Sequence, residues 1–328
     1  MRTYIIKRAD IEDVFSMPDY VSTIETAFKL YGRGGVQMPP KMYLTFDKGD
    51  LRCMPVYVPS MNAAGVKTVN VHSTNRDMPT VMATITLVAP ETGFPLAIMD
   101  GTHITNMRTG AAGAVAAKYL SKDNSQVAAF IGAGNQARTQ LAALLVTRPA
   151  ISRVNAYDIR EVVVQSFLDH VAAEYALDVE CASSVSDAIA DADIVTTTTP
   201  VRKPIVEAED VRKGTHISAI GADAQGKQEL DPEILKQARV VIDNWEQASH
   251  SGEINVPLSK GIITRDDIYG DIGEIATGVK PGRESAEQIT VFDSTGLAIQ
   301  DISVASEIYR KLTTDKELEA RLDRVDLV

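Results

Sequence analysis

The segment whose residue types and spacing most clearly suggest chemistry is a glycine-rich turn near the middle of the chain. The apolar run Val127–Ile131 leads into Gly132, Gly134 and Ala137, spaced as G-x-G-x-x-A, and a helical pattern follows. In a dinucleotide-binding turn the first glycine makes the bend, the second lets a pyrophosphate approach the backbone, and the third residue lets helix and strand pack closely. The pattern predicts a pyrophosphate site at a helix N-terminus; the alternative is an ordinary glycine-rich turn.

An acidic residue lies at the position where dinucleotide-binding folds carry one to bind a ribose hydroxyl. Asp158 follows a second apolar run, Val154–Tyr157, and lies roughly twenty residues beyond the glycines, as in dinucleotide-binding folds. A carboxylate at this place accepts hydrogen bonds from a ribose hydroxyl and repels a 2′-phosphate, so we expect NAD rather than NADP. Arg160 is the opposing feature, because an arginine beside the site could accommodate that phosphate.

Candidate groups for the reaction lie at one strand end and among several apolar runs. The apolar run Ile217–Ile220 leads through small residues to Asp223, and an open parallel sheet places substrate groups at such strand ends; the alternative for Asp223 is a loop-capping role. Four cations each lie in or beside an apolar stretch nearer the N-terminus: Lys41, Arg52, Lys67 and Arg108. Together they indicate a pocket for a carboxylate and a pyrophosphate, although each alone could be a surface residue with a buried stem.

The elements that must position these groups fall into two patterns, of which the second begins near residue 126. Strand-like and helical runs alternate there, which predicts a doubly wound, Rossmann-type parallel sheet with helices on both faces. The expected strands are Val127–Ile131, Val154–Tyr157, Asp178–Cys181, Ile194–Thr197, Ile217–Ile220, Val240–Ile242 and Ile289–Phe292, and the expected helices are Asn135–Thr147, Glu161–Tyr175, Val185–Asp191 and Pro232–Ala238.

The N-terminal part predicts a smaller α+β domain. Ser16 and Pro18 are typical of a helix start, and Gly32 ends the apolar periodicity that follows. Strands are expected over Lys41–Phe46, Leu51–Tyr57, Val66–Val71 and Val81–Val88, and a helix rich in small residues over Met107–Leu120. A last helix, Leu297–Leu322, has no place in the parallel sheet and is expected to pack on this domain. We therefore expect residues 1–120 with 297–328 to form one domain and residues 121–296 the other.

Composition narrows the class of protein further. The chain has 328 residues and a formal net charge of −11, which disfavours a nucleic-acid partner. Its two cysteines and five histidines show no metal-type spacing, so neither a metal site nor a disulfide is expected. No apolar run is long enough to cross a membrane, and the N-terminus lacks the pattern of a signal peptide, so we expect a cytoplasmic protein.

Several short motifs, taken together and in order, carry a resemblance to a known family. They are Gln37-Met-Pro-Pro-Lys41, Asp50-Leu-Arg-Cys-Met-Pro55, Gly65-Val-Lys-Thr-Val-Asn70, Pro79-Thr-Val-Met-Ala83, Met107-Arg-Thr-Gly-Ala-Ala112, Ile131-Gly-Ala-Gly-Asn-Gln136, Ile220-Gly-Ala-Asp223 and Phe292-Asp-Ser-Thr-Gly-Leu-Ala298. The chain resembles the ornithine cyclodeaminase/mu-crystallin family over essentially its whole length, and most closely the archaeal-type alanine dehydrogenase branch.

The resemblance implies a homodimeric enzyme whose first domain binds the substrate and dimerises while the second binds NAD. Lys67 and Asp223 match the family's catalytic lysine and aspartate, and Lys41 and Arg52 match substrate-side positions. Arg108 matches an arginine between the substrate carboxylate and the cofactor. The other positions that match the cofactor side are Thr80, Gly132, Gly134, Asn135, Gln136, Asp158, Ile220, Gly221, Lys227 and Ser294.

The expected reaction is the reversible conversion of L-alanine, NAD and water to pyruvate, ammonia and NADH. Cyclodeaminases of the family carry a glutamate where this chain has Arg52, and no other carboxylate is apparent there. A distal ammonium ~4 Å from Arg52 would be opposed by about 4 kcal/mol at an effective dielectric of ~20. The alternatives are an ornithine cyclodeaminase, with Glu253 or another acid taking the ammonium, a related imine or 2-oxo acid reductase, and a non-catalytic crystallin-like binding protein. The presence of Lys67 and Asp223 argues against the last.

Overall fold

The computed structural model describes residues 2–327, and the chain forms two compact units. Unit 1 comprises Met1–Arg108 with Leu297–Val328, and unit 2 comprises Thr109–Gly296. The division falls inside helix α3 (Gly101–Leu120), which therefore contributes to both units, whereas residues 1–120 are all expected in the first domain from the sequence. Among residues 2–327, no helix is both long enough and apolar enough to cross a membrane.

Unit 1 is built on a seven-stranded sheet with the strand order β15-β1-β6-β5-β4-β3-β2. The strands are β1 (Thr3–Ile6), β2 (Met42–Phe46), β3 (Gly49–Val58), β4 (Ala63–Val71), β5 (Val81–Val88), β6 (Pro95–Asp100) and β15 (Asp323–Val325). All neighbours are antiparallel except β1 and β6. Strand β6 is not predicted from the sequence, because a six-residue apolar run is too short to show its period. Gly93, at φ 72°, makes the turn that brings β6 beside β5.

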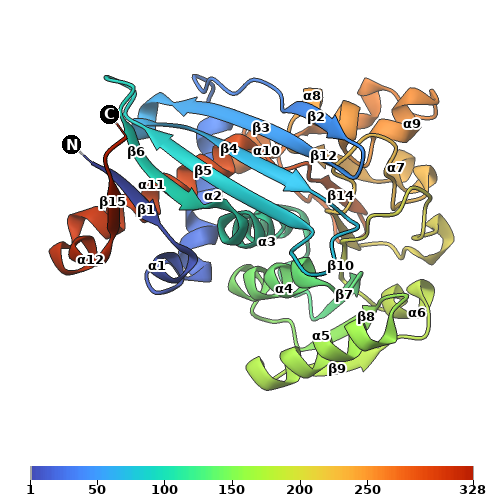
Figure 1. The fold of residues 1–328 in the computed structure, drawn as a ribbon. Helices are drawn as coiled ribbons and strands as arrows, with labels where there is room; N and C mark the ends of the chain where they lie inside the picture. The colour runs from blue at the N-terminus through green and yellow to red at the C-terminus, as the bar shows by residue number, and fades with distance from the viewer. Residues whose placement is uncertain (1, 328) are drawn as a thin grey trace. The chain divides into compact units, whose positions relative to one another are not determined.

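Two long helices cover one face of this sheet and lie behind it in Figure 1: α2 (Met17–Gly32) and α11 (Ala298–Thr314). Ser16 forms a capping box with Asp19 at the start of α2, next to Pro18, so the predicted helix start is confirmed. Side chains of β3 alternate between buried and half-buried, because successive residues point to opposite faces. Helix α11 packs on β3, β4 and β5 and against α2.

The prediction of one helix over Leu297–Leu322 is wrong. Asp315 is extended, with φ −88° and ψ 115°, and it separates α11 from a second helix, α12 (Lys316–Arg321). The Asp315 carboxylate accepts hydrogen bonds from the amides of Glu317 and Leu318, which caps α12. The chain then forms β15, which pairs antiparallel with β1.

Unit 2 is an eight-stranded parallel sheet with the order β13-β12-β14-β11-β10-β7-β8-β9. Its strands are β7 (Val127–Ile131), β8 (Arg153–Tyr157), β9 (Asp178–Cys181), β10 (Ile194–Thr197), β11 (His216–Ala219), β12 (Arg239–Ile242), β13 (Ile268–Asp271) and β14 (Thr290–Asp293). The chain runs outward from β7 through β9 and resumes at β10 on the other side of β7. The switch point of the sheet thus lies between β7 and β10, where parallel α/β sheets bind ligands beyond the carboxyl ends of their strands.

Helices line both faces of this sheet: α4 (Asn135–Thr147), α5 (Glu161–Glu174), α6 (Val185–Ile189), α7 (Pro232–Gln237), α8 (Trp245–Ser251), α9 (Asn255–Ser259) and α10 (Ile272–Ala276). Alternate residues of β7 enter two separate apolar clusters. Phe130 packs with residues of α4 and α5, whereas Ile131 packs with residues of β11 and α7. The doubly wound α/β fold expected from the sequence is confirmed.

Candidate active site

The glycine turn after β7 has the geometry that its sequence predicts. Gly132 has φ 90°, and a Cβ there would meet Thr198 Oγ1 and Thr199 Cγ2 at 2.9 Å, so only glycine fits without strain. Gly134 is the N-cap of α4, and a Cβ built on it meets no heavy atom within 4 Å. The amide end of α4 is therefore open to a ligand on the side of Gly134.

Asp158 lies beside this turn. Its carboxylate accepts hydrogen bonds from the amide of Ala133 at 3.1 Å and from the amide of Arg160 at 2.9 Å. The side chain of Arg160 is largely exposed, and its Nε lies 3.5 Å from Asp158 Oδ1. Gln136 and the exposed Asn135 occupy the first turn of α4. The structure thus brings the predicted pyrophosphate and ribose residues together.

The remaining cofactor-side positions of unit 2 follow β11 and β14, which are neighbours in the sheet. Ile220 and Gly221 form the turn after β11, and Asp223 follows with a third of its side chain exposed. Lys227 Nζ donates to Asp223 Oδ1 at 2.5 Å. Ser294 is buried just after β14, and its Oγ has no hydrogen-bond partner within the described part of the chain. All of these residues share the carboxyl edge of the sheet with the glycine turn.

In unit 1, three of the four predicted cations are buried: Arg52, Lys67 and Arg108. Lys67 lies in β4 with 1% of its side chain exposed, and its Nζ is 2.7 Å from Asp301 Oδ2. Arg108, in α3, donates through Nε to Asp301 Oδ1 at 2.9 Å and through Nη1 to Gln300 Oε1 at 2.8 Å. Asp301, which is not predicted as a site residue from the sequence, therefore bridges two residues that are.

The environment of Lys67 changes its protonation. Burial lowers the pKa of Lys67 from 10.5 to about 7; the charges of Arg108 and Lys41 lower it too, and Asp301 opposes the change. Lys41 lies just before β2 and is half-buried. Thr80 is exposed just before β5, and its carbonyl accepts a hydrogen bond from the amide of His72.

Arg52 is held in place by a neighbour on its own strand. Asp50 accepts hydrogen bonds from Arg52 Nε at 2.9 Å and Nη2 at 3.1 Å, and the guanidinium carbon lies 5.5 Å from the centre of the Tyr43 ring. Two carboxylates offset part of the charge of these cations: Asp50 pairs with Arg52, and Asp301 pairs with Lys67 and Arg108. Burial of Arg52 in this pair fixes its direction.

Glu253, which the sequence offers as a candidate acid for a substrate ammonium, instead binds backbone amides inside unit 2. It is fully buried in unit 2, and its carboxyl group accepts hydrogen bonds from the amides of Glu229 and Leu230.

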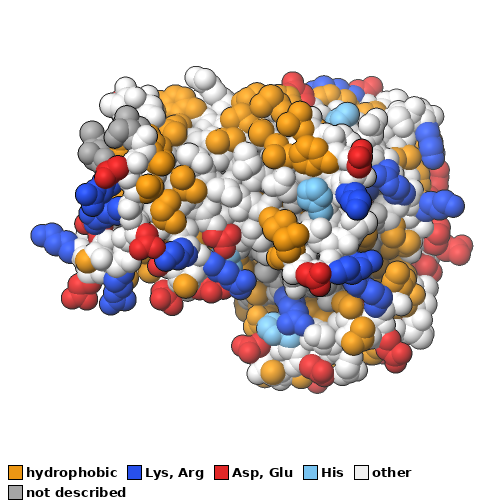
Figure 2. Space-filling view, in the orientation of Figure 1, with side chains coloured by type: hydrophobic (Ala, Val, Ile, Leu, Met, Phe, Trp, Pro, Cys, Tyr) orange, Lys and Arg blue, Asp and Glu red, His pale blue; other side chains and the backbone are white. Residues whose placement is uncertain are grey.

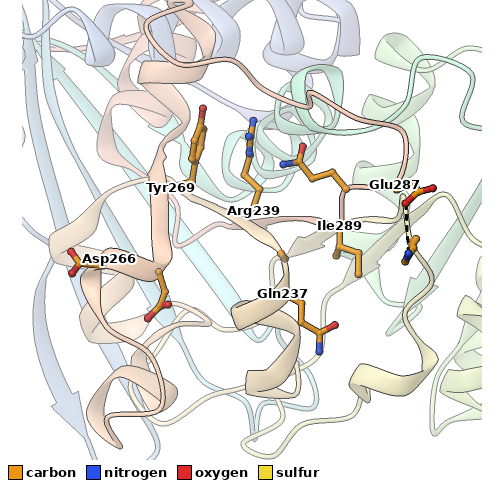
Figure 3. Close-up of a pocket in the computed structure, with 10 residues that line it drawn as sticks. Gln237, Arg239, Asp266, Tyr269, Glu287 and Ile289 are labelled. Atoms are coloured by element: carbon orange, nitrogen blue, oxygen red, sulfur yellow. Dashed lines mark ion pairs between the residues drawn. The ribbon is translucent and has the colours of Figure 1, made fainter.

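A hollow of about 510 Å³ lies at the opposite, amino edge of the unit 2 sheet (Figure 3). Arg239 and Tyr269 line it, with the guanidinium carbon 4.1 Å from the ring centre, and Lys213 pairs with Glu287 across 3.6 Å. None of the predicted site residues lines this hollow. The predicted chemistry and this hollow are therefore separate features of unit 2.

The sheet, its switch point and the open glycine turn define a dinucleotide-binding α/β protein. The family model of the ornithine cyclodeaminase/mu-crystallin family matches residues 1–316, so the chain belongs to this family, and the resemblance read from the motifs is confirmed. The alanine dehydrogenase of Archaeoglobus fulgidus is 52% identical over 313 residues, which are 94% of this chain and 95% of that one.

Two solved structures extend the comparison. An archaeal alanine dehydrogenase dimer with bound NAD matches with a TM-score of 0.93 and 49% identity, over all of both chains. The Thermococcus litoralis Δ1-pyrroline-2-carboxylate reductase, in complex with NADH and L-proline, matches with a TM-score of 0.92 and 36% identity, over 95% of this chain and 98% of that one.

Proposed function

We propose that this protein is an NAD-dependent alanine dehydrogenase that interconverts L-alanine and pyruvate. The observation that carries the proposal is the buried Lys67, whose pKa is lowered to about 7 among further cations. A lysine that titrates near neutral pH can both give and take a proton at a carbonyl oxygen. The 52% identity to an alanine dehydrogenase supports the same reaction.

The residues of unit 2 fit an NAD molecule. The open face of Gly134 suits a pyrophosphate, and the Asp158 carboxylate suits a ribose hydroxyl. Ile159 is 89% exposed directly beside Asp158, which offers an apolar surface to an adenine ring. The Ser294 hydroxyl has no partner among residues 2–327, which leaves a hydrogen bond available at the same edge of the sheet. When bound, NAD would supply the hydride acceptor.

The residues of this chain supply position, charge and protons. Arg52, with Lys41, would hold the substrate carboxylate, which leaves the α-carbon to be oxidised to an iminium. Asp223 would take a proton from the water that adds to that carbon and pass it to the amino group, which leaves as ammonia; Lys67 would take the proton of the new hydroxyl as pyruvate forms. In the reverse direction protonated Lys67 would polarise the pyruvate oxygen. Asp301 would hold the lysine nitrogen in place throughout.

We further propose that the protein is a homodimer formed through unit 1. Met42, Leu44 and Phe46, on edge strand β2, are large, apolar and exposed. Figure 2 shows hydrophobic side chains gathered over the sheet of unit 1. An exposed hydrophobic patch of this kind is typical of a protein–protein interface. The related archaeal alanine dehydrogenase is a dimer. Light scattering of the unmodified protein and of a Leu44→Asp variant tests this, with a monomeric variant as the expected outcome.

The decisive experiment is a substrate screen that follows NADH absorbance. Pyruvate with ammonia is expected to consume NADH, and L-alanine with NAD to produce it. Faster NADH consumption with Δ1-pyrroline-2-carboxylate would favour an imine reductase, the activity of the Thermococcus litoralis relative. Proline formed from ornithine without net NADH change would replace the proposal by a cyclodeaminase. A Lys67→Met variant serves as the inactive control.

A further inference from the structure

A fully buried carboxylate, that of Glu229, lies directly beneath the turn after β11. Its Oε1 accepts hydrogen bonds from the amide and the hydroxyl of Thr199, both at 2.7 Å. Its Oε2 accepts from Thr197 Oγ1 at 2.7 Å and from the amide of Gly221 at 2.8 Å. One side chain thus ties the end of β10 to the turn that follows β11.

The turn and the carboxylate are in close contact. A Cβ on Gly221 would lie 2.7 Å from Glu229 Cδ and 2.2 Å from the carbonyl oxygen of Thr199. Such distances exclude a side chain, so glycine at this position lets the amide reach the carboxylate. Gly221 is followed after one residue by Asp223, whose amide donates to the Gly221 carbonyl at 3.1 Å. A displacement of Gly221 would therefore displace Asp223.

A second buried carboxyl group holds the backbone of Glu229 itself. Glu253 Oε1 accepts from the amide of Leu230 at 2.7 Å and from the amide of Glu229 at 3.0 Å. Burial raises the pKa of Glu253 well above its ordinary value, and the charge of Glu229 adds to the rise. Burial also raises the pKa of Glu229, whereas the hydrogen bonds from Thr199, Thr197 and Gly221 oppose that rise.

We propose that Glu229 is a positioning residue for Asp223: it fixes the turn Ile220–Asp223 through the Gly221 amide and joins it to the end of β10. This inference deepens the proposed function and rests on it for the role of Asp223. Glu229 is assigned no contact with substrate or cofactor, and it acts through the backbone of the turn.

The substitution Glu229→Gln tests this arrangement because it preserves shape and removes one acceptor. With its amide nitrogen at the Oε2 position, the side chain would present a donor to the Gly221 amide. With the nitrogen at the Oε1 position, it would present a donor to the Thr199 amide. Either orientation leaves one buried backbone donor without an acceptor.

Glu253→Gln is the matched control. It is the same change at an equally buried site. The Glu229 amide lies 3.0 Å from both oxygens of Glu253, so an amide oxygen at the Oε1 position keeps one of these two contacts and the hydrogen bond from the Leu230 amide. Both variants are compared with the unmodified protein in turnover of pyruvate, ammonia and NADH, and in amide hydrogen exchange followed by mass spectrometry.

For Glu229→Gln we expect kcat to fall on the order of a hundredfold, as for a small misplacement of a catalytic group, with little change in the KM for pyruvate. Exchange should accelerate in residues 198–201 and 219–227 and stay unchanged elsewhere. Glu253→Gln should retain near-normal kcat and exchange. Unchanged exchange over 219–227 in Glu229→Gln, or an equal loss of kcat in both variants, would overturn the proposal.

Two safeguards keep the test decisive. If Glu229→Gln does not fold, Thr197→Val removes a donor from the same Oε2 atom without changing size, and unaltered exchange over 219–227 in that variant would also overturn the proposal. If the unmodified protein does not turn over pyruvate, the proposed function fails, whereas hydrogen exchange still reports on whether Glu229 fixes the turn.

Discussion

Asp301 Oδ2 lies 2.7 Å from Lys67 Nζ, and both side chains are buried. The other oxygen of the same carboxylate, Asp301 Oδ1, accepts a hydrogen bond from Arg108 Nε. A buried carboxylate shared by two cations both orients the lysine and moderates the drop in its pKa. Asp301 is thus the group through which the protonation of Lys67 can be tested.

Asp301→Asn should lower the pKa of Lys67 below about 7, because burial and Arg108 would then act without the opposing charge. Reductive amination needs the protonated lysine, so the pH above which the rate falls should move to lower pH. The measurement is kcat for pyruvate and ammonia against pH. Asp100→Asn, which alters the cap of α3 in the same unit, should leave that limb in place. If the fall of kcat at high pH stays at the same pH in Asp301→Asn, Asp301 does not influence the protonation of Lys67.

Lys67→Met and Asp223→Asn should each reduce turnover by at least about a hundredfold, the usual contribution of a general acid or base. NADH binding, followed by fluorescence titration, should change little in either variant. A variant that keeps near-normal turnover would remove its residue from the mechanism.

Arg52→Gln should raise the KM for pyruvate by roughly tenfold to a hundredfold, the effect of losing hydrogen bonds to a charged group. The increase has a second cause, since Asp50 would then face the substrate carboxylate without its cation. Asp50→Asn, which keeps the guanidinium but loosens it, should give a smaller increase. An unaltered KM in Arg52→Gln would place the carboxylate elsewhere, and ornithine should yield no proline with the unmodified protein.

Asp158→Asn should increase the use of NADP relative to NAD, since the charge that repels a 2′-phosphate is removed. The amide oxygen can still accept the Ala133 amide, so the turn should persist. Arg160→Ala in the same background should reverse the gain, because Arg160 is the nearby cation. Initial rates with both cofactors measure the ratio, and tighter NADP binding by the unmodified protein would show that Arg160 already outweighs Asp158.

Asp293→Asn should flatten the dependence of stability on pH. Burial raises the pKa of Asp293 from 3.8 to about 8, so the folded state holds a proton that the unfolded state has lost between these values. The native protein should therefore lose unfolding free energy as pH rises, by up to about 1.4 kcal/mol per unit from this group. Thermal unfolding from acid to mildly alkaline pH measures both slopes, and parallel slopes would contradict the shift.

The sequence predicts unit 2 better than unit 1, for a physical reason. In unit 2 each motif is local: strand, Gly132, helix and Asp158 follow one another, and the fold only has to close them into a sheet. In unit 1 the short strand β6 carries no readable period, and the break at Asp315 depends on an aspartate that caps the helix after it rather than continuing the helix before it.

The site groups that the sequence does not predict have partners far away in the chain. Asp301 meets Lys67 and Arg108 only after the strands and α11 have packed. Glu229 reaches Thr199, 30 residues earlier in the chain, from a loop of its own. The signal in the sequence is the presence of two polar residues, Gln300 and Asp301, in the first turn of a helix whose first turns are buried. A buried carboxylate in such a position calls for a cation, but the sequence does not say which.

The interruption of unit 1 by unit 2 has a consequence for biosynthesis. Lys67 and Arg108 leave the ribosome long before Asp301, with all of unit 2 translated in between. Since domains generally fold as units during synthesis, unit 2 can complete its sheet while β3, β4 and β5 still lack the cover of α11. Lys67 and Arg108 in the nascent first segment therefore cannot pair with Asp301 until the C-terminal segment has been synthesised.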